Sequence, residues 1–378
     1  MLSQILKKDF DYILKKNSFL KELEGKTILI SGINGFIPSY ITEFLLYLNK
    51  NVFDKKVKII GIARNEKKCK NRFSEYLNDE NLNFIFQNIC TPFEIKEKID
   101  YILHCASQAS PKYYSIDPIG TIDANILGTK NLLEIAKNNS AESFLFFSSS
   151  EVYGEIPLKE FPVKESYIGK RDLKNIRNCY SESKSMGEMY CQSYFHQYNV
   201  PAKIVRVFHT YGPGLQKGDG RVFMDFVENI LQNEDIIMKS DGKAMRTFCY
   251  IADAVGAYFR ILLLGENGEV YNVGNSYQEI SILNLAKMLS SLSEDNIKVI
   301  EKERSKDDSY LKSTVNKNIG DILKIENLGW KPEIKILDGF KRTIEYMKEQ
   351  ESLSLSKQAS KQASKQASKQ ASKQATIA

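Results

Sequence analysis

Short runs of apolar and β-branched residues recur along the first half of the chain, separated by longer stretches with helical periodicity. Six such runs lie between residues 27 and 208: TILISG, VKIIGIA, LNFIFQN, YILHCAS, SFLFFSSS and AKIVRVF. Strands that are apolar at nearly every position are buried on both faces, as in parallel sheets covered by helices. The pattern therefore predicts an α/β fold, with a doubly wound parallel sheet over residues 26–210.

The segments on either side of this region have different patterns. Residues 1–25 carry apolar side chains at a spacing close to 3.6, which predicts an amphipathic helix that packs on the main domain or on a partner subunit. Beyond residue 210 the alternation is less regular and glycine-rich loops interrupt it. We expect residues 211–350 to form mainly a smaller α/β lobe that binds substrate, with room for some segments to return to the first domain.

The last part of the chain is a repeat. From Ser356 to Ala375 the tetrapeptide SKQA occurs five times, and this polar composition cannot build a core, so residues 351–378 are expected to be a disordered tail. A period of four residues is also what a repeated CAAG tetranucleotide encodes. A slippage-prone gene tract and an ordinary protein repeat are both open interpretations.

Composition excludes several classes of protein. The longest apolar runs are far shorter than the roughly 20 residues of a membrane span, so no membrane association is expected. The formal charge of +6 comes largely from the tail lysines, and no basic patch indicates nucleic acid. Six singly scattered cysteines and three histidines predict neither a disulfide framework nor a metal site, and favour a reducing cytoplasmic compartment.

A glycine pair follows the first predicted strand. In GINGFIP, Gly32 and Gly35 stand where the strand turns into a helix, with Pro38 where a third glycine is usual. Missing side chains let the backbone turn tightly and approach a pyrophosphate at the helix N-terminus. As the first turn of a βαβ series, this motif predicts a Rossmann-type dinucleotide site.

The second strand bears on which dinucleotide is bound. It ends at Arg64, where a site for NAD usually carries an acid that binds the ribose 2′-hydroxyl. Arg64 would suit the 2′-phosphate of NADP, or it is a solvated arginine in a basic stretch. The cofactor is therefore expected to be NAD or NADP.

A second motif predicts proton transfer. Tyr180 and Lys184 are four residues apart and share one face of a helix, so the ammonium can lower the pKa of the phenol and let phenolate take a proton from a sugar hydroxyl. In SSSEVYG, Ser149 ends a strand at the edge where such sheets bind ligands, and Glu151 lies just beyond it. In the alternative interpretation the serines cap a loop and Glu151 is solvated.

These stretches resemble a family. HCASQASPKYYSIDPIGTIDANILGTKNLLEIAK, SSSEVYG, RNCYSESK, RVFHTYGPG, GDGRVFMDF and RTFCYIADA look like extended short-chain dehydrogenase/reductases that act on nucleotide sugars, most closely UDP-glucuronate decarboxylases. The resemblance covers about residues 26–290. It implies a tightly held nicotinamide cofactor, a nucleoside-diphosphate sugar oxidised transiently at C4, and a homodimer.

The resemblance also implies roles for individual residues. The implied catalytic residues are Ser149, Glu151, Tyr180 and Lys184. The implied cofactor-binding residues are Gly32, Asn34, Gly35, Phe36, Ile37, Arg64, Asn88, Ile89, Ala106, Ser107 and Asn125, together with Tyr180 and Lys184. The implied substrate-binding residues are Ser150, Arg177, His209, Arg221 and Arg246, the last two as planar cations that grip the diphosphate.

Small differences favour one reaction. Nucleotide-sugar 4,6-dehydratases typically carry Thr-Asp-Glu where this chain has Ser149, Ser150 and Glu151, and decarboxylation needs no acid for a leaving hydroxyl. Pro38, Arg64 and His209 depart from the decarboxylase pattern. An NADPH-dependent reductase of a 4-keto-6-deoxy nucleotide sugar is therefore the first alternative. A 4-epimerase, a divergent dehydratase and a nucleotide-binding scaffold without chemistry follow.

Overall fold

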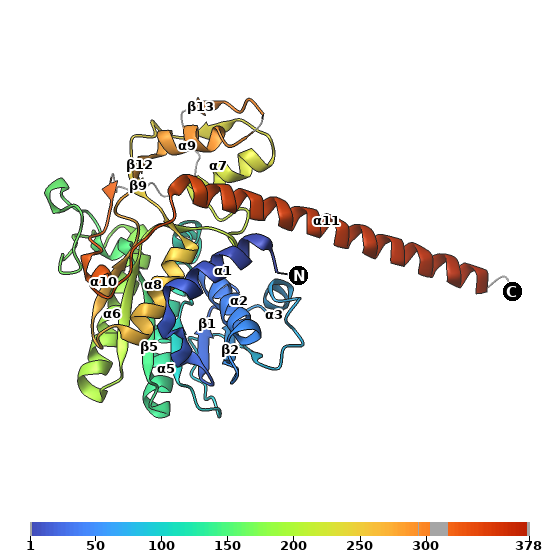
Figure 1. Cartoon of the computed structure of the whole chain (residues 1–378). Coiled ribbons are helices and arrows are strands. Elements are labelled where there is room, and N and C mark those ends of the chain that lie inside the picture. Colours follow the sequence, from blue (N-terminus) through green and yellow to red (C-terminus); the bar gives the residue numbers. More distant parts are fainter. Residues whose placement is uncertain (1, 294, 303–316, 376–378) are drawn as a thin grey trace.

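The computed structural model describes residues 2–293, 295–302 and 317–375, and its centre is a sheet of seven parallel strands (Figure 1). The strand order is β11-β6-β5-β4-β1-β2-β3, so the chain reverses direction across the sheet between β1 and β4. Ligands of open α/β sheets bind beyond the carboxyl ends of the strands at such a point. The strands are β1 (Thr27–Ser31), β2 (Lys58–Ala63), β3 (Leu82–Phe86), β4 (Tyr101–His104), β5 (Ser143–Ser149), β6 (Ala202–Val207) and β11 (Val270–Val273).

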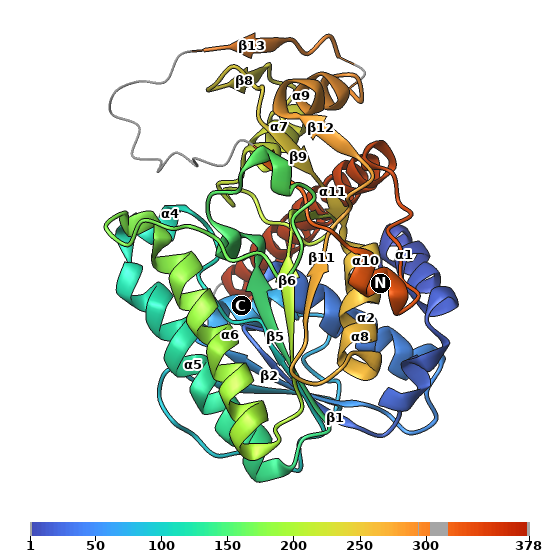
Figure 2. The ribbon, with the colours of Figure 1, turned by 90° about the vertical axis from the view of Figure 1, so that its left-hand side faces the viewer.

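Helices cover both faces of this sheet (Figure 2). On β1, Ile28 and Ile30 point into a core shared with one set of helices, whereas Leu29 points into a second core on the opposite face. This alternation is why the strands are apolar throughout. The first set consists of α1 (Gln4–Lys16), α2 (Phe36–Asn51) and α8 (Ile251–Leu264), and the second of α5 (Pro118–Asn139) and α6 (Cys179–Tyr198).

The predicted doubly wound sheet is confirmed, and all six apolar runs are strands. The seventh strand, β11, comes from the region beyond residue 210 and pairs with β6. Helix α8 comes from the same region and also packs in the first domain. The short strands β7 (Thr210–Tyr211) and β10 (Cys249–Tyr250) pair with each other in a separate two-stranded sheet. The shorter helices are α3 (Glu66–Arg72), α4 (Lys112–Ile116) and α10 (Leu323–Asn327).

A smaller group of elements lies beyond one end of the sheet (Figure 1). We call it the lobe; it contains α7 (Val222–Leu231), β8 (Ile236–Met238), β9 (Met245–Thr247), β12 (Glu279–Ser281), α9 (Ile282–Ser290), β13 (Val299–Glu301) and β14 (Lys317–Asn318). Strand β9 pairs with β12 and β14, and β8 pairs with β13. These pairings bring the segment after residue 316 back beside residues 245–247.

The N-terminal segment is an integral part of the main domain. Helix α1 buries Phe10 and Ile13 in the core that contains α2 and α8, and a 3-10 helix, η1 (Ser18–Leu23), follows it. The buried carboxylate of Asp9 accepts hydrogen bonds from the Tyr250 hydroxyl at 2.7 Å and from Arg342 at 2.8 Å. The expected amphipathic helix is thus present, and it packs on its own chain.

The C-terminal segment differs from the expected disordered tail. Helix α11 (Ile336–Ala375) begins against the main core, where Phe340 stacks on Tyr211 with ring centroids 4.1 Å apart, and then extends away from the body (Figure 1). The SKQA repeats continue this helix because alanine, lysine and glutamine are strong helix formers and the tract contains neither glycine nor proline. Within the described residues, no helix is both long and apolar enough to span a membrane.

Candidate active site

A cavity of about 2280 Å³ lies between the carboxyl ends of the strands and the lobe. Its wall contains the turn after β1, the ends of β2, β4 and β5, the first turns of α6, and residues of β9, β13 and β14. Of the residues implied by the family resemblance, all but Asn125 line this cavity. The fold therefore brings together groups that are up to about two hundred positions apart in sequence.

The turn after β1 is shaped for a close approach of backbone to ligand. Gly32 has φ +66°, and a Cβ built on it would lie 2.8 Å from the Cα of Ala106. The Gly35 N–H donates to the Gly32 carbonyl at 2.8 Å, and α2 begins at the next residue. The first N–H groups of α2 have no partner within the helix, so they can bind an anion. Pro38 is tolerated because it stands within this first turn.

Polar atoms next to this turn fit a cofactor. The hydroxyl of Ser107 lines the cavity, is buried, and makes no hydrogen bond with any described residue. Buried polar atoms in native proteins normally have partners, so a bound ligand would satisfy it. Asn125 lies behind the wall, next to Ala124, and donates from Nδ2 to Ser183 at 2.9 Å. Its buried side-chain oxygen has no hydrogen-bond partner among the described residues, and its family-implied contact with the cofactor stays a prediction.

A buried hydrogen-bond chain supports this wall, and the sequence motifs did not indicate it. The Ser31 hydroxyl oxygen accepts the N–H groups of Cys105 and Ala106, so its own proton is assigned to His104 Nδ1, 2.8 Å away. The other ring nitrogen of His104 then donates to Thr129 at 2.9 Å. Burial, together with the charge of Lys184, lowers the pKa of His104, in keeping with a neutral ring.

The end of β2 presents cations to the cavity. Arg64 is exposed and lines the wall, and Lys68, one turn into α3, does so too. Asn65 caps α3 by accepting the Lys68 N–H at 2.9 Å. From this part of the chain, the described lining includes no carboxylate.

Tyr180 and Lys184 both lie on the buried face of α6. The Lys184 ammonium donates to the Phe147 carbonyl at 2.6 Å and lies 5.9 Å from the centroid of the Tyr180 ring. Burial lowers the pKa of Lys184 to about 7. The predicted i, i+4 pairing on one face agrees with this arrangement.

The electrostatics of Tyr180 differ from the expectation. Burial raises the pKa of the Tyr180 phenol; a hydrogen bond with Ser149 lowers it, Glu151 raises it and Arg221 lowers it. Lys184 was expected to lower this pKa; the lowering contributions come instead from the Ser149 hydrogen bond and the Arg221 charge, and burial outweighs them. Ser149 is thus placed beside the phenol, as the strand-end position predicted.

Glu151 forms an ion pair. Its two carboxylate oxygens accept hydrogen bonds from the two terminal nitrogens of Arg177, at 2.8 and 2.9 Å. The side chains are 30% and 12% exposed, respectively, so water only partly screens the pair. Such bidentate contacts fix orientation as well as charge. Glu151 is therefore held at the cavity wall, and the interpretation of a solvated Glu151 is disfavoured.

Two arginines bring positive charge to the cavity wall near His209. Arg221, Arg246 and His209 all line the cavity, and the charges of both arginines act on the imidazole. Burial lowers the pKa of His209 to about 3, and the two arginines add to this effect, so the imidazole is neutral. Arg221 also pairs with Asp219 and lies 5.2 Å from the centroid of the Phe223 ring. This end can bind an anionic group such as a diphosphate.

Among the wall residues that sequence reasoning missed, two contact predicted site residues directly. The ring of Tyr114, from α4, stacks on Tyr180 with centroids 5.0 Å apart and planes 14° apart. Asn318, from β14, donates from Nδ2 to the Ser150 hydroxyl at 3.1 Å. Tyr114 lay inside the stretch SPKYYS that carried the resemblance, whereas nothing in the local pattern around Asn318 indicated a site.

Comparisons with known proteins agree with this geometry. A model of the NAD dependent epimerase/dehydratase family matches residues 28–274. UDP-glucuronic acid decarboxylase 5 of Arabidopsis thaliana is 33% identical over 313 residues, which cover 82% of this chain and 86% of the plant protein. UDP-glucuronic acid decarboxylase 1 of Xenopus tropicalis is 31% identical over 348 residues, covering 92% of this chain and 78% of the frog protein.

Solved structures share the fold. UDP-glucose 4-epimerase from Thermotoga maritima, with UDP-glucose, has a TM-score of 0.71 and 25% identity, covering 86% of this chain and 99% of that one. UDP-glucuronic acid 4-epimerase from Bacillus cereus, in complex with UDP-glucuronic acid and NAD, has a TM-score of 0.73 and 23% identity. The match covers 85% of this chain and 99% of the Bacillus cereus chain. This likeness confirms the fold.

Proposed function

Because the chain belongs to the NAD dependent epimerase/dehydratase family, we propose that it decarboxylates a nucleoside-diphosphate glucuronate through transient oxidation at C4. It is an enzyme of the nicotinamide-dependent decarboxylase, epimerase and dehydratase type, and the proposal concerns its reaction and substrate. The observation that carries it is the wall beside Tyr180, where Ser150 replaces an acid and Glu151 is paired with Arg177. The similarity to curated UDP-glucuronic acid decarboxylases supports it.

The residues divide the proposed reaction among themselves. Tyr180 takes the proton of the C4 hydroxyl, and Ser149 orients the oxygen beside it. A nicotinamide cofactor, held at the Gly32 turn and beside Ser107, would accept a hydride from C4 and later return it. Arg221 and Arg246 hold the diphosphate.

The carbon–carbon bond breaks only after C4 is a ketone. The C6 carboxylate then belongs to a β-keto acid: the C5–C6 bond breaks, carbon dioxide leaves, and its bonding electrons become the enolate between C4 and C5. C5 takes up a proton, for which Glu151, at the wall beside Tyr180, is the proposed donor or relay. No group is needed to protonate a leaving hydroxyl, which agrees with a serine at position 150.

The direct test is to incubate the purified protein with UDP-glucuronate and NAD and to follow products by mass spectrometry and proton NMR. We expect loss of carbon dioxide and formation of a UDP-pentose. Conversion to a sugar of unchanged mass with inverted C4 would instead identify a 4-epimerase. Loss of water would identify a dehydratase, and either result would refute the proposed reaction.

Arg64 and Lys68 support a second candidate, an NADPH-dependent reductase of a 4-keto-6-deoxy nucleotide sugar. Both cations can bind the 2′-phosphate that distinguishes NADP from NAD. The two candidates are separated by supplying NADPH with such a 4-keto sugar and measuring the loss of absorbance at the nicotinamide band. Arg64→Ala should weaken binding of NADP much more than binding of NAD if the arginine reads the phosphate.

We further propose that the enzyme is a homodimer in a reducing cytoplasm and serves surface polysaccharide synthesis. All six cysteines are free thiols, which suits that compartment. Large apolar side chains are exposed on neighbouring helices α4, α5 and α6, and a second copy could cover them: Ile116, Ile119, Leu127, Met186 and Met189. Light scattering after chromatography should give twice the chain mass, and Met189→Glu should shift it toward the monomer.

A further inference from the structure

The lobe contributes one polar side chain directly beside the catalytic strand end. Asn318 of β14 donates from its amide nitrogen to the Ser150 hydroxyl oxygen at 3.1 Å. The two residues are 168 positions apart, and each is at most 9% exposed. Both line the cavity, so a ligand in it can contact them.

The backbone on both sides holds Asn318 in place. Strand β14 runs parallel to β9 with Asn318 opposite Arg246, so the two side chains point to the same side of that sheet. Thr247 donates to the Asn318 carbonyl at 3.4 Å, and the Val163 N–H donates to the Ile319 carbonyl at 2.9 Å. The amide is therefore preorganised at the wall.

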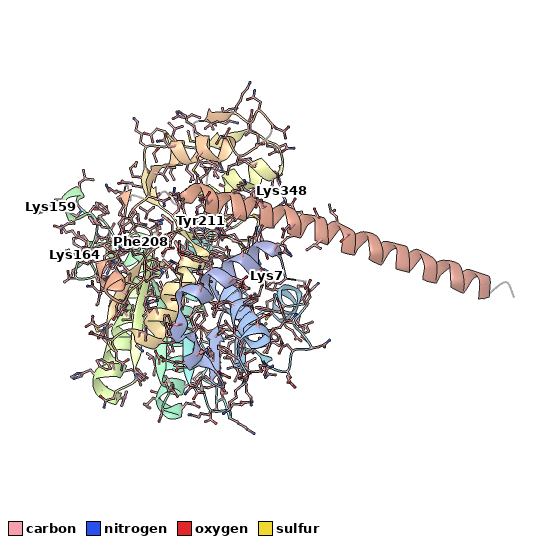
Figure 3. The ribbon with its side chains drawn as sticks, in the orientation of Figure 1. Lys7, Lys159, Lys164, Phe208, Tyr211 and Lys348 are labelled. Carbon is pink, nitrogen blue, oxygen red and sulfur yellow. The ribbon has the colours of Figure 1, made fainter. Side chains whose placement is uncertain are left out.

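Packing below the segment is equally tight. Phe208, labelled in Figure 3, is buried and packs in a small cluster with Tyr153 and Val163. A Cβ built on Gly320 would come within 2.5 Å of the Phe208 ring, and one built on Gly274 would lie 2.9 Å from the Phe208 Cβ. Because positions 274 and 320 are glycines, the 318–320 segment can approach this ring so closely. The position of Asn318 thus follows from the core and is not an accident of a surface loop.

The contact leaves specific hydrogen-bonding capacity facing the cavity. Because the Ser150 oxygen accepts from Asn318, its own proton can be donated elsewhere. The Asn318 amide keeps a second N–H to donate. In the proposed reaction Ser149 and Tyr180 mark the position of C4, and the C6 carboxylate is attached to the adjacent carbon. Ser150 is the next residue along the chain and also lines the cavity, so it is a polar group available to that carboxylate.

We propose that Asn318 and Ser150 together recognise the C6 carboxylate of the substrate, with Asn318 as the specificity-determining residue that the lobe supplies. This inference rests on the proposed function. A neutral amide and a hydroxyl can each donate a hydrogen bond to a carboxylate. An aspartate at position 318 would instead face the substrate with a like charge and with neither of the two N–H donors of the amide.

The test compares two ligands that differ only at C6. UDP-glucuronate and UDP-xylose, which lacks the carboxylate, are titrated calorimetrically into the cofactor-loaded protein and into Asn318→Asp and Asn318→Ala. We expect Asn318→Asp to weaken UDP-glucuronate by about 10- to 100-fold, the range for hydrogen bonds to a charged group, and to leave UDP-xylose nearly unchanged. Asn318→Ala should act in the same direction with a smaller loss.

The matched control is Asn284→Asp, which makes the same charge change on an exposed lobe residue outside the cavity lining. It should leave both affinities unchanged. Equal weakening of both ligands in Asn318→Asp, or weakening of neither, overturns the inference. A wild-type protein that binds UDP-glucuronate but releases no carbon dioxide refutes the proposed reaction instead. In that case a selective loss in Asn318→Asp would still support recognition of the carboxylate.

Discussion

The ion pair between Glu151 and Arg177 allows a quantitative test of how the site is organised. Two hydrogen bonds of 2.8 and 2.9 Å join a carboxylate and a guanidinium that are only 30% and 12% exposed. Hydrogen bonds to charged groups contribute about 1.5–3 kcal/mol in proteins, and a tenfold change in rate corresponds to about 1.4 kcal/mol. If Arg177 acts by orienting Glu151, the coupling between them should therefore be about 10- to 100-fold in kcat/KM.

The experiment is a double-mutant cycle with Glu151→Gln, Arg177→Met and the double variant, measured as kcat/KM on UDP-glucuronate. Glu151→Gln should lower it by about 10²- to 10⁴-fold, as expected for a lost proton-transfer group. Arg177→Met should cost about 10- to 100-fold. The double variant should resemble Glu151→Gln alone, because Arg177 has nothing left to orient.

A matched pair nearby supplies the control. Arg171 also borders the cavity and pairs with Glu182, with side-chain exposures of 16% and 33%. Arg171→Met removes a similar charge without touching Glu151, so its effect should multiply with that of Glu151→Gln. If the losses of Arg177→Met and Glu151→Gln also simply multiply, Arg177 acts on the substrate independently and the proposed orienting role is refuted.

Three further outcomes follow from single contacts. Tyr180→Phe keeps the ring that stacks on Tyr114 but loses the phenol, so turnover should fall about 10²- to 10⁴-fold while calorimetry shows nucleotide-sugar binding retained; unchanged turnover would exclude Tyr180 as the proton-transfer group. Gly32→Ala places a Cβ 2.8 Å from a backbone atom at φ +66°, so it should lower the free energy of urea unfolding by about 2–4 kcal/mol. Gly218→Ala, at φ +69° with open space around it, should lower it by only about 1–2 kcal/mol. Equal losses would contradict the role of the close approach. Burial lowers the pKa of Lys184 from 10.5 to about 7, so between these pH values the unfolded chain binds more protons and stability rises with pH. Lys184→Met should remove this part of the rise when urea unfolding of the cofactor-free protein is compared at pH 7 and pH 9. An identical rise in both proteins would disprove the prediction.

Much of the fold and of the cofactor end could be predicted from local patterns. Runs of buried β-branched residues, a glycine pair after the first of them, and a tyrosine and a lysine at helical spacing each depend on neighbours within a few positions. Gly32 had to be glycine because its backbone is left-handed, and Tyr180 had to share a face with Lys184 because a helix repeats every 3.6 residues. Such features leave a local pattern in the sequence, so they can be predicted without knowing which distant segments meet.

The substrate end depended on the path of the whole chain. Helical spacing placed Lys184 beside Tyr180, but only the tertiary structure shows that burial lowers the pKa of Lys184 to about 7. Burial also raises the pKa of the Tyr180 phenol, although Ser149 and Arg221 oppose this rise. The SKQA tract was expected to be disordered for lack of a core, whereas its helix-forming residues simply extend α11.

By itself, therefore, the sequence determined the parallel sheet, the glycine turn proposed to receive a dinucleotide, and the helical pairing of Tyr180 with Lys184. The tertiary structure alone decided that Arg177 pairs with Glu151, 26 positions apart in sequence, and that Asn318 contacts Ser150, 168 positions apart. The physical reason is that a periodic backbone fixes which neighbours meet, whereas contacts between distant segments arise only when burial of the cores sets their relative positions.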